Sequence, residues 1–220
     1  MQLNPPASPV LLHVCCAPCS GAIIEALCTE GLRPTLFWSN SNIYTADENE
    51  RRLAVLQPYA AKFGLQVVVD EYDHAAWREF VASQMGAGPD GAEQLLASCP
   101  ERGARCELCF RFRLLRAARY AAAGGFGCLT TSLASSRWKS LEQVDEAGEW
   151  AVAQVNSEAS GTSACASAPA AGLLWWPQNW RKGGLQERRG AIIREQNFYN
   201  QSFCGCEYSA NHESTNNSIS

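Results

Sequence analysis

Short apolar runs alternate with longer segments of helical periodicity along most of the chain. The short runs are rich in aliphatic, β-branched or aromatic residues and have turn-forming residues nearby, which is typical of buried strands. We therefore expect strands at 9–14, 34–39, 65–70, 126–131 and 173–176.

The segments between these runs place apolar residues at helical spacing, and several of them end at a glycine. We expect helices at 20–31, 45–64, 75–85, 106–125 and 139–155. Strands and helices in alternation predict an α/β protein with three layers, α/β/α, around a mainly parallel sheet. In such sheets, ligands bind at the carboxyl ends of the strands.

The length of 220 residues fits one large domain. We expect a single domain over residues 1–209. The stretch at about 156–172 is small, polar and without periodicity, which predicts a flexible insertion. Residues 210–220 have the composition of a disordered tail.

Composition indicates an ordinary soluble protein, with 46% hydrophobic and 18% charged residues. No apolar run approaches the roughly 18 residues of a membrane span, so no membrane partner is expected. The first residues, "MQLNPPASP", lack the layout of a secretory signal, and we expect a cytoplasmic protein. The net charge of −4 argues against a globally basic nucleic-acid binder, but not against a local basic surface.

Cysteine usage is the first functional clue. The chain has 11 cysteines, and an odd number in a cytoplasmic protein favours metal binding or redox chemistry over a disulfide framework. Seven of them fall into three clusters, which are Cys15, Cys16 and Cys19 after the first strand, Cys106 and Cys109 at a helix start, and Cys204 and Cys206.

The first two clusters together offer four or more thiols to a metal. Since a helix amino terminus favours the thiolate, we expect lowered pKa values at Cys19, Cys106 and Cys109. Four thiolates suit structural zinc and an iron–sulfur cluster equally well. The position of Cys15 and Cys16 at the ligand-binding edge of the sheet favours a catalytic centre.

The third cluster, Cys204-Gly-Cys206, has a single residue between its two cysteines. A disulfide there would close a small, strained and easily reduced ring, which suits redox work. Two further metal ligands are the alternative. The remaining cysteines are interpreted as buried apolar residues at Cys28, Cys99 and Cys128, and as a bystander at Cys165.

The cysteine motifs occur within longer segments that resemble a known family. These segments are "LLHVCCAPCS", "EYD" (71–73), "RCELCFRFRL" (105–114), "TTSL" (130–133) and "NFYNQSFCGCEYS" (197–209). They resemble the QueH-type epoxyqueuosine reductases over roughly residues 9 to 209. The resemblance implies a fold similar to the PP-loop ATP pyrophosphatases (HUP-like), and a catalytic domain that reduces epoxyqueuosine to queuosine at the wobble position of tRNA without cobalamin.

The resemblance also implies roles for individual residues. The family's [4Fe-4S] ligands fall on Cys15, Cys16, Cys106 and Cys109, and its redox-active pair falls on Cys204 and Cys206. The family is associated with a second metal, expected here to be a mononuclear iron, for which Cys19, Asp73 and His13 are candidates by chemistry alone. The expected partners are tRNA bearing epoxyqueuosine and an unidentified electron donor.

RNA binding then has to come from local charge. The stretch 179–194 combines basic residues, which can hold phosphates, with aromatic faces that can stack on unpaired bases. Its candidates are Trp180, Arg181, Lys182, Arg188 and Arg189. A second basic run lies at Arg111, Arg113, Arg116 and Arg119. Solvated helix faces are the alternative for both.

Two other classes of function stay open on the residues alone. The first is a thiol–disulfide oxidoreductase that acts through Cys204 and Cys206 on protein or small-molecule disulfides. The second is a zinc-containing, nucleic-acid-binding protein without catalysis.

Overall fold

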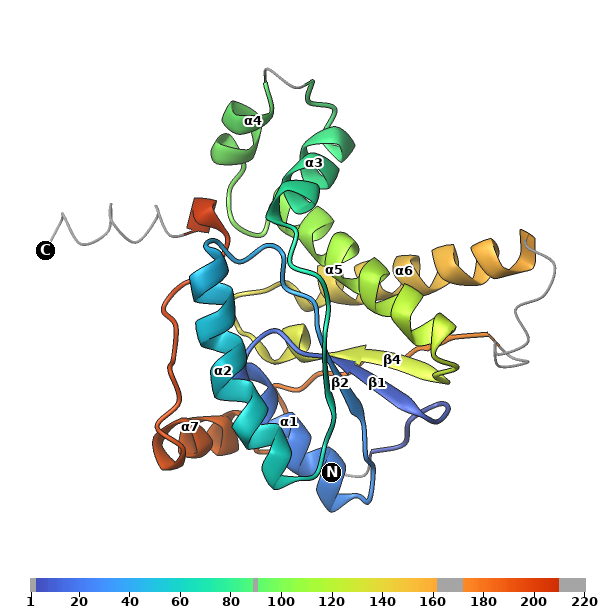
Figure 1. Cartoon of the computed structure of the whole chain (residues 1–220), viewed down its shortest axis with the longest axis vertical. Helices are drawn as coiled ribbons and strands as arrows, with labels where there is room; N and C mark the ends of the chain where they lie inside the picture. Colours follow the sequence, from blue (N-terminus) through green and yellow to red (C-terminus); the bar gives the residue numbers. More distant parts are fainter. Residues whose placement is uncertain (1–2, 89–90, 162–171, 210–220) are drawn as a thin grey trace, which may run out of the picture.

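A computed structural model describes residues 3–88, 91–161 and 172–209. Its centre is a parallel sheet with the strand order β3-β2-β1-β4-β5 (Figure 1). The strands are β1 (Val10–His13), β2 (Thr35–Trp38), β3 (Val67–Val69), β4 (Cys128–Thr131) and β5 (Leu174–Trp175). The expected strands and their parallel arrangement are confirmed.

Helices cover both faces of the sheet, so the predicted three layers are confirmed. One layer holds α1 (Ala17–Thr29), α2 (Ala46–Lys62) and α7 (Leu185–Glu195), which pack on one another through α1. The other layer holds α5 (Ala104–Ala123) and α6 (Leu141–Gly161). Helices α3 (His74–Gln84) and α4 (Ala92–Ser98) lie beyond the end of the sheet, with α3 against α5 (Figure 1).

Two helices were not expected from the sequence. The first, α4, is short, and the second, α7, lies in the basic stretch that we interpreted as an RNA-binding segment. Leu185 and Ile192 are the buried positions of α7, and they give it an apolar side that packs on α1. In this helix, charged residues occupy most of the other positions.

The predicted insertion at about 156–172 is wrong for its first residues, because α6 continues to Gly161. The Asn156 side chain also ties the helix to the start of β5. Its amide donates to the carbonyl of Leu173 at 2.9 Å and its oxygen accepts from the Leu173 N–H at 3.0 Å. Residues 162–171, Cys165 among them, and the expected tail at 210–220 lie outside the described residues.

The sheet reverses its winding beside β1. The chain runs outward from β1 through β2 to β3, and then returns to place β4 on the other side of β1. The carboxyl ends of β1 and β4 therefore form the switch point, where open α/β sheets bind ligands. The loop after β1 carries "CCAPC", and a 3-10 turn, η1 (Ser132–Ser135), follows β4.

The strand β1 is buried along its whole length, including His13. The His13 ring lies 2.8 Å from the Thr131 hydroxyl through Nδ1 and 3.2 Å from the Ser39 carbonyl through Nε2. Burial lowers the pKa of His13 to about 3, so the ring is neutral. Within the described residues, no helix is long and apolar enough to cross a membrane.

Candidate thiol-rich site

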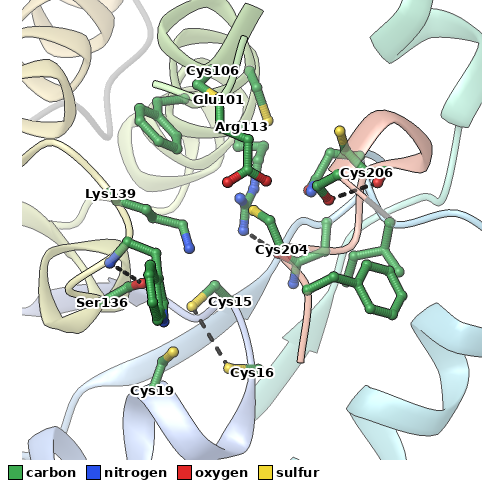
Figure 2. A pocket seen from close by; sticks show the side chains of 18 of the residues that line it. Cys15, Cys16, Cys19, Glu101, Cys106, Arg113, Ser136, Lys139, Cys204 and Cys206 are labelled. Carbon is green, nitrogen blue, oxygen red and sulfur yellow. Dashed lines mark hydrogen bonds between the residues drawn. The ribbon is translucent and has the colours of Figure 1, made fainter. Parts of the chain in front are cut away.

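The three cysteine clusters line one cavity of about 350 Å³ at the carboxyl edge of the sheet. In Figure 2, Cys15, Cys16 and Cys19 lie on one side, Cys106 on the opposite side, and Cys204 between them. Residues nearly 200 positions apart in the sequence therefore meet in the place that the parallel sheet predicts.

The first cluster is held by the start of α1. Cys16 is the N-cap residue of this helix, and Pro18 in the first turn fixes the backbone there. The sulfurs of Cys15 and Cys16 lie 4.0 Å apart, and those of Cys15, Cys16 and Cys19 all lie within 4.8 Å of one another. This spacing suits three ligands of a single metal ion.

The second cluster lies in the first turns of α5, on the other side of the cavity. Two cysteine sulfurs accept backbone hydrogen bonds here, from Arg105 N to Cys99 at 3.3 Å and from Arg102 N to Cys106 at 3.3 Å. Cys99 therefore contributes more than apolar packing, because it caps the turn that presents the two ligand candidates. Cys28 and Cys128 lie outside the lining of the cavity, as their interpretation as apolar residues requires.

The expected lowering of the thiol pKa values is wrong for Cys19, Cys106 and Cys109. A hydrogen bond with Cys15 raises the pKa of Cys19 to about 11, and burial adds to this effect. Burial raises the pKa of Cys106 to about 12 and also raises the pKa of Cys109. Desolvation of the thiolate thus outweighs the helix amino terminus. By contrast, hydrogen bonds with Cys16 and Cys19 hold the pKa of the Cys15 thiol well below its usual value.

The third cluster lies on a loop whose backbone carbonyls accept hydrogen bonds from neighbouring residues. Gly205 has φ +114°, and its carbonyl accepts a hydrogen bond from the N–H of Tyr44 at 2.9 Å. The Arg52 guanidinium donates to the carbonyl of Cys204 at 3.1 Å. Cys204 is exposed, whereas Cys206 is buried, and burial raises the pKa of Cys206 to about 11. Both are free thiols.

Six arginine and lysine side chains line the cavity with these thiols, and three of them are Arg105, Arg113 and Lys139. Arg105 and Arg113 are buried. Arg105 donates to the Leu96 carbonyl, and Arg113 donates to the Ser39 carbonyl and the Asn40 side chain. Within the described part of the chain, none of the three cations forms an ion pair with a carboxylate.

Buried cations without counter-ions are unfavourable unless negative charge lies beside them. Two side-chain nitrogens of Arg105 also lack a hydrogen-bond partner in the described structure. Glu101 is the acidic residue among those that line the cavity. The site is therefore suited to thiolates and to an anionic thiolate-bound metal centre, and the residues present fit an iron–sulfur cluster.

Only one of the three candidate ligands for a second metal lies with the cysteine clusters. Cys19 belongs to the compact sulfur group. Asp73 is not among the residues that line the cavity, and its carboxylate caps α3 by accepting the N–H of Ala76 at 2.9 Å. His13 is fully buried with both ring nitrogens in hydrogen bonds. The structure thus brings only Cys19 of these three to the other cysteines.

The residues that we predicted to bind RNA have different environments in the structure. Trp180 is completely buried and donates its indole N–H to the Thr131 carbonyl at 3.0 Å, so the expectation that it stacks on a base is wrong. Arg188 is paired with two carboxylates, and Arg181 donates to the Lys139 carbonyl. Arg189 reaches the cavity, and Lys182 is exposed.

The side chains of the second basic run make contacts within the protein. Arg113 is buried in the cavity wall. The other three guanidiniums form ion pairs within the protein, as Arg111–Glu107, Arg116–Asp70 and Arg119–Glu158.

Sequence reasoning missed several residues of the site. Ser132, Trp138 and Lys139 follow β4, so the rule that ligands bind at strand carboxyl ends could have singled them out. The burial of Arg105 and Arg113 gave no such signal, because a buried arginine and a solvated one look alike in a polar helix, and Arg113 was interpreted only as part of a basic run.

The fold and the site define a class: a doubly wound α/β protein with a thiol-rich, cation-lined cavity at its switch point. Comparison with known proteins gives the family. The family model described as "Epoxyqueuosine reductase QueH" matches residues 10–212. The chain belongs to this family, which confirms the resemblance of its cysteine motifs.

Several relatives carry the same description. The chain is 33% identical over 200 residues to epoxyqueuosine reductase QueH of Histophilus somni, and the match covers 91% of this chain and 71% of the relative. The corresponding protein of Haemophilus influenzae gives the same identity and coverage. That of Acinetobacter baylyi is 32% identical over 209 residues, covering 95% of this chain and 84% of the relative.

Proposed function

We propose that this protein is an oxidoreductase that reduces epoxyqueuosine at the wobble position of tRNA to queuosine. The observation that supports this most directly is the convergence of all three cysteine clusters on one cavity. Family membership supports the choice of substrate, since its relatives are named epoxyqueuosine reductases.

The proposed cofactor is a [4Fe-4S] cluster held by Cys15, Cys16, Cys106 and Cys109. When bound, the cluster would supply one-electron transfer beside the substrate. Arg105 and Arg113 balance the negative charge of the thiolates from the cavity wall. Cys19, beside the first pair, is the proposed ligand of a second, mononuclear iron.

The proposed electron source is the Cys204/Cys206 dithiol. Its oxidation to a disulfide releases two electrons and two protons. Reduction of the epoxide breaks both of its carbon–oxygen bonds, forms the carbon–carbon double bond and releases the oxygen as water, which consumes the same two electrons and two protons. One turnover is therefore balanced, and an external electron donor regenerates the dithiol.

Lys139 is the proposed proton donor to the leaving oxygen. Burial lowers the pKa of Lys139, but its proximity to the sulfurs of Cys204, Cys15 and Cys19 acts in the opposite direction and the net shift is upward, so its side chain faces both thiol groups as an ammonium. Figure 2 shows its amine directed into the cavity. A fixed ammonium stabilises negative charge that develops on the epoxide oxygen.

The decisive experiment is metal analysis of anaerobically purified protein. We expect about four irons and four acid-labile sulfides per chain, with a brown iron–sulfur absorption spectrum. Cys106→Ser should lose the cluster, whereas the matched Cys28→Ser, on the far part of α1, should keep it. Iron beyond four would support the second metal.

Activity on tRNA that carries epoxyqueuosine then tests the reaction itself. Zinc without sulfide, despite anaerobic handling, would contradict the iron–sulfur mechanism and favour a zinc-binding protein. Reduction of simple disulfides without any effect on this tRNA would favour a thiol–disulfide oxidoreductase.

A further inference from the structure

An exposed tryptophan stands at the rim of the thiol cavity. Trp138 is 79% exposed, the largest value among the large hydrophobic residues that are exposed in the described structure. It also lines the cavity. A single exposed apolar side chain needs no explanation on a protein surface. Here, however, the neighbouring backbone is held in place, and arginines line the cavity and the hollow next to it.

The loop that carries Trp138 is fixed from two sides. Arg102, just before α5, donates to the Trp138 carbonyl at 2.9 Å and to the Arg137 carbonyl at 3.1 Å. Gln186 of α7 donates to the Ser135 carbonyl at 2.9 Å. The backbone N–H of Trp138 donates to the Ser136 hydroxyl at 3.4 Å. An exposed indole on an ordered loop is a preorganised contact surface.

The surface around the ring is positively charged. Arg189 lines both the main cavity and a shallow hollow beside it, which Arg137, Gln186 and Glu187 complete. In the part of the chain that the structure describes, neither Arg137 nor Arg189 forms an ion pair. Glu187 in the hollow and Glu101 in the cavity are the facing acids.

We propose that this rim, formed by Arg137, Trp138 and Arg189, docks the unpaired anticodon nucleotides of an RNA. A base adjacent to the one in the cavity stacks on the Trp138 indole, and the two arginines hold the phosphates on either side. An aromatic face beside unpaired cations is the combination that binds single strands, and it is continuous with the cavity. The inference rests on the proposed function, because that function places a wobble nucleotide in the cavity.

Binding of a fluorescently labelled anticodon stem-loop RNA tests this directly, with a fully paired RNA of matched length as the second probe. Trp138→Ala should weaken stem-loop binding about 5- to 100-fold and leave duplex binding unchanged, since only unpaired bases offer a face. Trp138→Phe should restore most of the affinity. The ring is outside the core, so the melting temperature should not change.

The arginines give a different signature. Arg137→Gln with Arg189→Gln should lower the slope of log affinity against log salt by about 1.4, which corresponds to two single-strand phosphates. Arg33→Gln, remote from the cavity, is the matched control and should change nothing. Equal stem-loop affinity of wild type and Trp138→Ala, or no stem-loop binding by wild type, would overturn the inference. Binding of a protein partner that depends on Trp138, without RNA binding, would do the same.

The two proposals fail separately. If the wild type reduces epoxyqueuosine in tRNA but Trp138→Ala has the same KM and affinity, the rim is not the docking surface and the reductase assignment stands. If stem-loop binding depends on Trp138 but no epoxide is reduced, the docking surface stands and the reductase assignment falls.

Discussion

The backbone N–H of Cys15 donates a hydrogen bond to the Ser132 hydroxyl at 3.0 Å, and the same hydroxyl lies 3.3 Å from the Cys15 sulfur. Cys15 follows β1 and Ser132 follows β4, so this pair of contacts bridges the two strands of the switch point. It fixes both the backbone and the sulfur of the first ligand candidate without involving another cysteine.

Ser132→Ala should therefore loosen the cysteine loop. The change leaves the buried N–H of Cys15 without its partner, which costs about 1–3 kcal/mol of folding free energy. We expect a lower melting temperature and a lower iron content after anaerobic purification. Ser83→Ala removes a hydroxyl from an exposed position of α3 and should alter neither. Full iron content in Ser132→Ala would show that the loop is fixed by the cysteines alone.

The dithiol role makes a separate prediction for Cys204 and Cys206. Serine at either position cannot form the disulfide, so single-turnover reduction of the epoxide should fall to background. Iron and sulfide content should stay at the wild-type level, because these residues are not proposed as cluster ligands. Cys128→Ser, in the sheet, is the control for loss of a buried thiol. Normal turnover in Cys204→Ser would remove the pair from the mechanism.

Gly205 between the two thiols is required for steric reasons. A Cβ atom there would lie 2.9 Å from an Arg52 nitrogen and 3.0 Å from the Ile43 side chain, at a φ of +114° that other residues rarely adopt. Gly205→Ala should displace the loop and lower kcat at least about tenfold while the metal content stays constant.

Gly31→Ala is the matched control for this prediction. Gly31 also has a positive φ, +81°, but a Cβ atom there would meet nothing within 4 Å, so the change introduces backbone strain without a clash. We expect a loss of stability and normal activity. Equal kcat in Gly205→Ala and the wild type would mean that the loop position does not limit turnover.

The sequence predicted the elements that carry the chemistry better than it predicted the surface around them. Cys15 could be placed at the edge of the sheet because a buried strand directly precedes it, and strand carboxyl ends meet at one edge. The convergence of Cys204 on the same cavity could not be read from periodicity. It depends on contacts of a loop with α2 residues such as Arg52, which lie far away in the sequence.

The errors have a common physical origin, which is burial. Trp180 and Arg113 both lie in segments that look like solvated surface, yet the fold buries both. Burial also reversed the expected direction of the pKa shift at Cys106, since a helix amino terminus does not offset the desolvation of a thiolate. Composition and spacing do not report the depth of a side chain in the folded protein.

Acid sensitivity offers a test of how the helical layer beside the site is held. Arg188 of α7 contacts Glu25 of α1 at 2.6 Å and holds the pKa of this carboxyl below its usual range. A carboxyl with a lowered folded-state pKa stabilises the protein above its unfolded pKa of about 4.3, and this stabilisation is lost as pH falls further.

Glu25→Gln should therefore lower the free energy of unfolding at neutral pH by about 1 kcal/mol or less, because the pair is partly exposed. The difference from wild type should shrink as pH falls below about 4.3 and vanish only below the lowered folded-state pKa of Glu25, where the wild-type carboxyl is also neutral. Urea unfolding at several pH values measures this. A difference that persists at low pH would mean that the effect comes from packing rather than from charge.

Substitutions of Lys139 test whether its ammonium donates a proton or serves only as a fixed positive charge. Lys139→Met removes the ammonium from the cavity, and we expect kcat to fall about 100-fold, the range of a positioned acid, with KM for tRNA nearly unchanged. Lys139→Arg keeps the charge but replaces a compact ammonium by a planar guanidinium with different donor positions, so it should preserve iron content without restoring kcat. Lys62→Met, at an exposed lysine in the last turn of α2, should leave both parameters at the wild-type level. If Lys139→Arg restored full turnover, the ammonium would serve as fixed positive charge beside Cys15 and Cys204, and the proton would have to come from another donor.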